Sequence, residues 1–283
     1  MNKEILTGDI EGVILAAEQL PTLPEVLAQV TRLVHDPKSN FEAIAEVISR
    51  DQVLSAKVLR LVNSPAYGLG EPVRTIQRAL FLLGYDVIEG IIITTTVFGQ
   101  SSRALARDWD HALGCAIACR IVAEAAGLDE PEAYGVAGLL HDLGKVIWMN
   151  QLDSLRTSVD WLLSKNGLYP REAEKQVLGF EHDAVNVWVA DLWHLPPGGA
   201  AAMAHHHSPL KAKVEPHYAW VAHLGDFLSH LVPAFSGQGP HVPFLEPAVL
   251  DNLHIRHEDL PDLLDPLEDA LDTMPEILLD HMR

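Results

Sequence analysis

Apolar residues recur at the spacing of an α-helix along nearly the whole chain, and this periodicity most restricts what the chain can fold into. In an early segment Leu27, Val30 and Leu33 follow one another at intervals of three, which places them on one face of a helix. No segment shows the sustained alternation of apolar and polar residues that is typical of a half-buried strand. The sequence therefore predicts an all-α protein.

Residues that begin and end helices divide this pattern into three parts. Among five short helices expected in the first hundred residues, Ser39 and Glu42 form a capping box before one helix. Gly84 ends another helix, and the next begins at Asp86. Because the composition also shifts beyond residues 237–240 (GQGP), we expect an N-terminal helical bundle over residues 1–100, a second helical domain over 101–236 and a C-terminal tail over 237–283.

The tail is acidic and amphipathic. Residues 241–283 hold eleven acidic and two basic residues, a net charge of −9 out of −19 for the whole chain. Leucines recur within it at helical spacing, at positions 250, 253, 260, 263, 264 and 267. We expect one or two exposed helices that pack either on the body of the protein or on a partner.

The overall charge and the cysteine content exclude several classes of function. A net charge of −19 argues against nucleic acid and against an anionic membrane surface as partners. The longest apolar run, residues 90–98 (GIIITTTVF), is too short to span a bilayer. No secretory signal pattern opens the sequence, and its two cysteines cannot form a disulfide framework. These features predict a cytoplasmic protein.

Residues 138–145 (GLLHDLGK) carry the strongest sign of chemistry. His141 and Asp142 are adjacent, so their side chains project about 100° apart on a helix and can converge on one ion. Lys145 follows one turn later and can reach a phosphate beside that ion. Alternatively, the pair is a retained feature of the fold in which Asp142 orients an imidazole in the core.

Cys115 and Cys119 form a small apolar stripe, which we interpret as a helix interface.

Several segments together resemble the HDOD family, a signalling-associated relative of the HD and HD-GYP phosphohydrolases. The resemblance extends over roughly residues 12–231 and is carried by segments 20–24 (LPTLP), 51–55 (DQVLS), 59–68 (LRLVNSPAYG), 73–83, 138–145, 181–182 (EH), 193–196 (WHLP) and 206–207 (HH). It implies an N-terminal helical bundle followed by an HD-like helical domain. Such domains are usually regulatory or output modules, often without demonstrated catalysis.

The same resemblance implies a metal site. By correspondence with the HD superfamily, the first ion would be held by His111, His141, Asp142 and Asp226, and a second by His182 and His206. Imidazole with carboxylate suits iron, manganese or zinc, so one or two divalent ions are the expected cofactors. Each of these residues has an ordinary structural role as its alternative. Of the run His205, His206 and His207, we expect two side chains to point away from any one site.

Two functions remain open from the sequence. The first is a non-enzymatic signalling module, such as a response-regulator output, which binds a signalling protein or a small regulatory ligand and can form a homodimer. Its groove would lie between the two helical blocks or near the 63–70 loop, where Asn63, Ser64 and Tyr67 are the candidate partner-binding residues.

The second is a metal-dependent phosphohydrolase acting on a nucleotide or a cyclic dinucleotide. Asp142 and Lys145 would be its catalytic residues, with Lys145 stabilising charge on the phosphoryl oxygens. Two departures count against the HD-GYP type. No Gly-Tyr-Pro follows His207, and Lys145, Lys211 and Lys213 are the few basic residues near the site in sequence.

Overall fold

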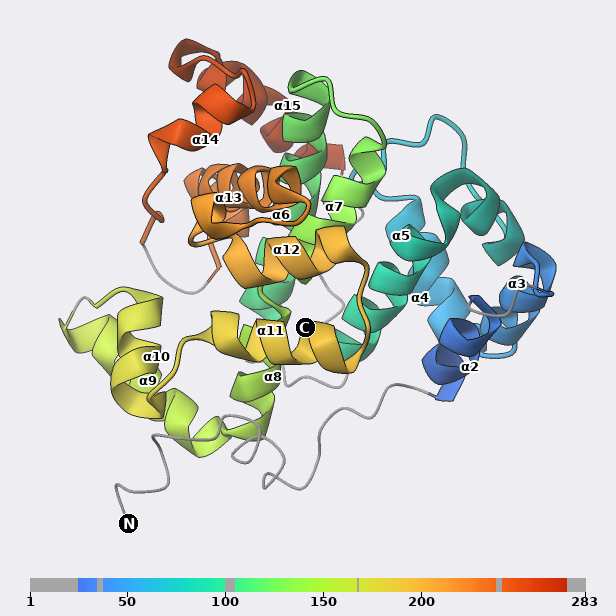
Figure 1. Ribbon diagram of the computed structural model, residues 1–283, viewed down its shortest axis with the longest axis horizontal. Coiled ribbons are helices and arrows are strands. Elements are labelled where there is room, and N and C mark those ends of the chain that lie inside the picture. Colours follow the sequence, from blue (N-terminus) through green and yellow to red (C-terminus); the bar gives the residue numbers. More distant parts are fainter. Residues whose placement is uncertain (1–24, 35–37, 100–104, 167, 238–240, 274–283) are drawn as a thin grey trace.

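The chain folds into packed α-helices, as the sequence predicts. The computed structural model describes residues 25–34, 38–99, 105–166, 168–237 and 241–273, and no strand occurs among them (Figure 1). The N-terminal group consists of α2 (Glu25–Val34), α3 (Phe41–Ser49), α4 (Gln52–Val62) and α5 (Ile76–Gly99).

The second and larger group of helices lies beside the first, and the tail lies over one end of it (Figure 1). This group consists of α6 (Ala106–Ala125), α7 (Pro131–Leu140), α8 (Leu143–Gln151), α9 (Asp153–Asn166), α10 (Pro170–Leu178), α11 (His182–Leu192), α12 (Pro197–His205) and α13 (Pro216–Leu231), with the short 3-10 turns η2 (Pro209–Lys211) and η3 (Pro233–Phe235). The tail contributes α14 (Pro247–Asn252), the turn η4 (His257–Asp259) and α15 (Leu260–Thr273).

Local sequence explains how the N-terminal helices begin and break. The side chain of Asn40 accepts a hydrogen bond from the backbone N–H of Ala43 and so caps α3. The cap predicted at Ser39 is therefore one residue too early. Gly84 has φ 75° and ψ 178° within α5, a conformation that glycine adopts without strain, and it divides α5 into the two helices that the sequence predicts.

Helix α5 is long and apolar enough, by length and composition, to cross a membrane. However, 61% of its most apolar 18-residue stretch is buried inside the protein. Ile88, Ile91 and Ile92 on this helix are fully buried and belong to the main hydrophobic core. The apolar character of α5 is thus explained by its packing against other helices.

The loop after α4 is held by its own side chains. The amide nitrogen of Asn63 donates to the backbone oxygens of Leu59 (2.7 Å) and Val73 (2.8 Å), and its amide oxygen accepts from the backbone N–H of Val73 (2.7 Å). Ser64 and Tyr67 are only 3% and 1% exposed. Of the three residues predicted to bind a partner, two therefore lie inside the protein, and the third closes its own loop.

Helix α6 crosses the centre of the second group and packs against α7, α13 and α15. The sulfur atoms of Cys115 and Cys119 lie 3.9 Å apart on this helix and are fully buried. A β-carbon at Gly138 would lie 2.6 Å from the backbone oxygen of Cys115, and one at Gly225 would lie 2.4 Å from the sulfur of Cys119. The two cysteines thus occupy a close helix interface, as expected.

The tail docks on the body of the protein. Helix α15 packs against α6 and α13, and α14 packs against α13. The leucines that face inward are Leu250, Leu253, Leu260, Leu263 and Leu267, each at most 9% exposed. The described part of the tail is therefore integrated into the fold, with its acidic residues on the outer side.

We expect Leu267→Ala to lower the free energy of unfolding by about 2–5 kcal/mol, because it leaves a cavity at a fully buried position between helices. Urea denaturation followed by circular dichroism measures this change. Leu210→Ala is the matched control, since Leu210 is 46% exposed and its truncation should cost little. Equal stabilities of the two variants would show that the tail adds nothing to the stability of the fold.

Candidate metal centre

The turn between α7 and α8 presents the adjacent histidine and aspartate. His141 follows the last residue of α7, and Asp142 directly precedes α8, so neither side chain lies in mid-helix. The side chain of the fully buried Asn186 fixes this turn. Its amide nitrogen donates to the backbone oxygens of His141 (2.6 Å) and Met203 (2.8 Å), and its amide oxygen accepts from the backbone N–H of Gly144 (2.7 Å).

One half of the centre forms around Asp226 on α13. The Nε2 atom of His111 lies 3.2 Å from Oδ1 of Asp226, and Nε2 of His141 lies 3.9 Å from the same oxygen. His230, one turn further along α13, places its Nδ1 atom 3.0 Å from that oxygen as well. Three imidazoles from three segments thus surround one buried carboxylate.

The other half forms around Asp142. Its Oδ1 atom lies 3.2 Å from Nε2 of His182, 3.4 Å from Nε2 of His206 and 3.7 Å from Nε2 of His141. The Nε2 atom of His207 lies 3.1 Å from Nε2 of His182. Because His141 approaches both carboxylates, Asp142 and Asp226, the two halves form one continuous cluster. The structure thus brings together all six residues that the resemblance predicts as metal ligands.

The histidine rings are oriented with one nitrogen outward and one inward. The Nδ1 atoms of His111, His141 and His206 lie 2.8, 2.6 and 3.1 Å from backbone carbonyl oxygens. Each of these Nδ1 atoms therefore carries the proton, and each Nε2 lone pair points into the cluster. Those three Nε2 atoms and Oδ1 of Asp142 are buried and make no hydrogen bond. Buried polar atoms without partners are costly, so this donor set fits a metal ion.

The pKa shifts of His141 and Asp142 favour the ligand form, whereas that of His182 opposes it. Burial lowers the pKa of His141 to about 3, which keeps its imidazole neutral. Burial alone would raise the pKa of Asp142, but His141 and Lys145 outweigh it and hold this pKa well below its ordinary value. For His182 burial is likewise outweighed, and Glu174 and Asp142 raise its pKa well above the ordinary value. A metal that binds His182 must therefore displace a proton.

Lys145 lies at the edge of the cluster. Its Nζ atom is 3.0 Å from Oδ1 of Asp108 and 3.4 Å from Oδ2 of Asp142. Burial would lower the pKa of Lys145, but the two carboxylates raise it well above its ordinary value, so the group is an ammonium ion. The predicted position of Lys145 beside the candidate ligands is thus what the structure shows. Asp108, which the sequence analysis did not single out, fixes it there.

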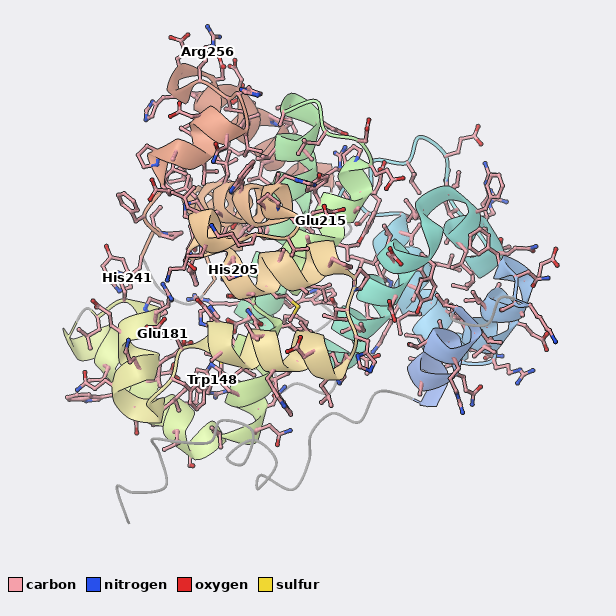
Figure 2. The ribbon with its side chains drawn as sticks, in the orientation of Figure 1. Trp148, Glu181, His205, Glu215, His241 and Arg256 are labelled. Carbon is pink, nitrogen blue, oxygen red and sulfur yellow. The ribbon has the colours of Figure 1, made fainter. Side chains whose placement is uncertain are left out.

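The sequence analysis did not predict His207 and His230 as members of the cluster, and its expectation for the three consecutive histidines was wrong. His206 and His207 both face the cluster, whereas two of the three consecutive histidines were expected to point away. Helix α12 ends at His205; His206 still has helical backbone angles as its C-cap, and His207 follows it in the turn. Figure 2 shows His205 at this end of α12. His230 was missed although it follows Asp226 by one helical turn, a spacing that could have found it.

The side chains of the cluster are little exposed to solvent. The side chains of His111, His141, His182, His206 and Asp226 are at most 4% exposed, whereas those of Asp142 and His230 are 14% and 19% exposed. The centre therefore suits small ions more readily than large ligands.

Glu174 orients His182 from behind. One oxygen of its buried carboxylate accepts from the Nδ1–H (2.8 Å) and the backbone N–H (2.9 Å) of His182. We expect Glu174→Gln to weaken metal binding by about 10–100-fold, because carboxylates that hold a ligating imidazole raise its basicity. Competition with a chromogenic chelator measures this affinity. Glu172→Gln, an exposed change on the same helix, is the control, and equal affinities would contradict the expectation.

Fold and centre together define an all-α, HD-like helical protein with a buried histidine–aspartate cluster. The sequence profile of the HDOD domain matches residues 20–209, more than half of the chain. The chain belongs to the HDOD domain family.

Solved structures share this fold at low sequence identity. An HDOD domain protein with unknown function from Geobacter sulfurreducens is 23% identical, with 97% of both chains covered and a TM-score of 0.65. A protein from Shewanella amazonensis SB2B, provisionally described as a metal-dependent phosphohydrolase, is 18% identical, with 94% of this chain and 98% of that chain covered and a TM-score of 0.63.

A relative of known sequence extends beyond the matched region. The chain is 22% identical over 197 residues to an uncharacterized protein from Treponema pallidum (strain Nichols). The match covers 68% of this chain and 38% of the length of that relative.

Proposed function

We propose that the protein is a regulatory HDOD module of bacterial signal transduction that binds one or two divalent ions in its buried centre. It would act by binding a signalling protein or a small regulatory ligand, without catalysis. The observation that carries this proposal is a set of four buried atoms that could ligate a metal and make no hydrogen bond. They are the Nε2 atoms of His111, His141 and His206 and Oδ1 of Asp142. Iron, manganese and zinc suit such imidazole and carboxylate ligands.

Binding is favoured over turnover by the surroundings of the centre. Lys145, the residue that would hold a phosphoryl group, is engaged by two carboxylates at 3.0 and 3.4 Å. The ligand side chains are almost fully enclosed. An ion in this position would join α6, the α7–α8 turn, α11 and α13, and would thereby set the shape that a signalling partner or regulatory ligand recognises.

A metal-dependent phosphohydrolase is the alternative, favoured by the position of Lys145, whose Nζ atom lies 3.4 Å from Oδ2 of the candidate ligand Asp142. A bound ion would supply a nucleophilic water by lowering its pKa. Lys145 would donate hydrogen bonds to the phosphoryl oxygens, and Asp108 would hold the ammonium in place.

Elemental analysis of untagged protein, purified without chelators, tests the metal. We expect about one or two equivalents of iron, manganese or zinc. A content below about a tenth of an equivalent after loading with each metal would overturn the proposal.

Assays of the metal-loaded protein with nucleotides and cyclic dinucleotides separate the two functions. We expect no hydrolysis product, neither free phosphate nor an opened or cleaved nucleotide, above the metal-only background. Metal-dependent hydrolysis that is lost in Lys145→Met, with metal content unchanged, would establish the phosphohydrolase instead.

A further inference from the structure

A second concave site lies apart from the metal centre. A pocket of about 560 Å³ opens between α5 on one side and α7, α12 and α13 on the other. None of the residues of the histidine–aspartate cluster lines it. Pockets of this size at the junction of two helical groups are typical positions for small ligands.

The mouth of this pocket is acidic. Asp86, Glu130, Glu132 and Glu215 line it, and they come from α5, α7 and α13 or the residues just before these helices. No lysine or arginine is among the described lining residues. Glu215 contacts a nearby imidazole, since one of its oxygens lies 3.1 Å from Nε2 of His217, which carries charge only when protonated.

The carboxylates converge on a tyrosine in the wall. Burial, and then the charges of Glu215, Glu130 and Asp86, raise the pKa of Tyr218. Three carboxylates from separate segments thus act on one ring. Figure 2 shows Glu215 on the side of the second helical group that faces α5.

Helix ends offset only part of this charge. Glu130 and Glu215 directly precede α7 and α13, and α12 also begins at the pocket. Each helix N-terminus contributes about half a positive charge, so four carboxylates still leave the mouth negative. Glu130 and Glu215 also have φ values of 55° and 45°, left-handed conformations that glutamate rarely adopts, and each precedes a proline.

The interior of the pocket is apolar and shaped by close packing. Val87, Val136 and Leu140 are buried and line it. The ring of Tyr218 stacks on Tyr134 with centroids 4.2 Å apart. This interior can take up an aliphatic chain while the mouth takes up positive charge.

We propose that this pocket binds a small organic cation with at least two amines on an aliphatic chain, an oligoamine. Its ammonium groups would contact the carboxylates of Asp86, Glu130, Glu132 and Glu215, and its methylene groups would lie against Val87, Val136 and the ring of Tyr218. The proposal goes beyond the metal centre and does not depend on it, because the two sites share no residue.

Isothermal titration calorimetry with spermidine tests the proposal in the full chain at roughly physiological ionic strength of 0.15 M. We expect one saturable site and no binding of 1,8-octanediol, which has a similar apolar chain without charge. The double variant Glu130→Gln/Glu215→Gln should bind spermidine at least about tenfold more weakly, because two charge-assisted contacts are lost.

Two control variants are needed to interpret a loss of spermidine affinity: one removes two carboxylates outside the pocket, and the other changes the metal centre. Glu71→Gln/Glu268→Gln removes two exposed carboxylates that do not line the pocket and should leave the affinity within about twofold. Asp142→Ala should also leave it unchanged, so failure of this proposal and failure of the metal proposal can be told apart.

Three outcomes would overturn the oligoamine assignment. The first is the absence of saturable spermidine binding, including the case in which an octalysine peptide binds instead and identifies a basic protein segment as the occupant. The second is equal weakening in both double variants, which would indicate diffuse attraction to an acidic surface. The third is Mg²⁺ competing as well as spermidine, which would show that the apolar interior adds nothing.

Discussion

Asp142→Ala is expected to abolish stable metal binding, lowering the bound metal to less than about a tenth of the wild-type content. Asp142 is the central carboxylate of one half of the cluster, with Oδ1 within 3.2–3.7 Å of the Nε2 atoms of His141, His182 and His206. Its removal takes away the one anionic ligand that these three imidazoles share. Elemental analysis after dialysis against metal-free buffer measures the result.

The helical fold should survive this change. Lys145 keeps Asp108 as a partner at 3.0 Å, so no buried ammonium is left without a counter-charge. Far-UV circular dichroism checks the fold, and Asp191→Ala, an exposed change on α11, is the matched control for metal content. A folded Asp142→Ala protein with unchanged metal content would show that the ion is held elsewhere. If the alanine variant does not fold, Asp142→Asn makes the same test with the side-chain volume retained.

Asn186→Ala is expected to lower the free energy of unfolding by about 3 kcal/mol or more, even in metal-free protein. Its side chain makes three buried hydrogen bonds, to the backbones of His141, Gly144 and Met203. Truncation would leave all three backbone groups without partners, and each such loss typically costs about 1 kcal/mol or more. Chemical denaturation in the presence of a chelator measures the loss.

Asn252→Ala is the control for this effect, since Asn252 is an exposed residue at the end of α14. If Asn186→Ala were as stable as this control, the α7–α8 turn would be held by other contacts. We also expect Asn186→Ala to bind the metal more weakly than the wild type, because the position of His141 depends on its own backbone oxygen being fixed.

Helical periodicity was sufficient to predict the fold class and several helix boundaries. The break at Gly84 and the inward leucines of the tail follow directly from local sequence. Periodicity could not show where the tail docks, because an amphipathic helix presents the same apolar stripe to its own body as to a partner. The contact of α15 with α6 settles that choice.

The candidate site was predictable only where motif and resemblance carried information. The convergence of His111, His182 and Asp226 with the His141–Asp142 pair depends on contacts between distant segments, and the resemblance supplied it. His207 and Glu174 were missed because their positions depend on where α12 ends and on a carboxylate that no motif marks. Tyr67 was predicted to bind a partner and is buried instead, because sequence does not show whether an aromatic side chain in a loop turns inward.

Helix α6 has almost no face in contact with solvent, since α7, α13, η3 and α15 cover it from different sides. We therefore expect the backbone amides in the middle of α6 to exchange their hydrogens mainly through unfolding of the whole domain and not through local opening of one neighbour. His111 lies in the first half of this helix, so we expect the segment that carries its imidazole to be among the slower parts of the protein to open.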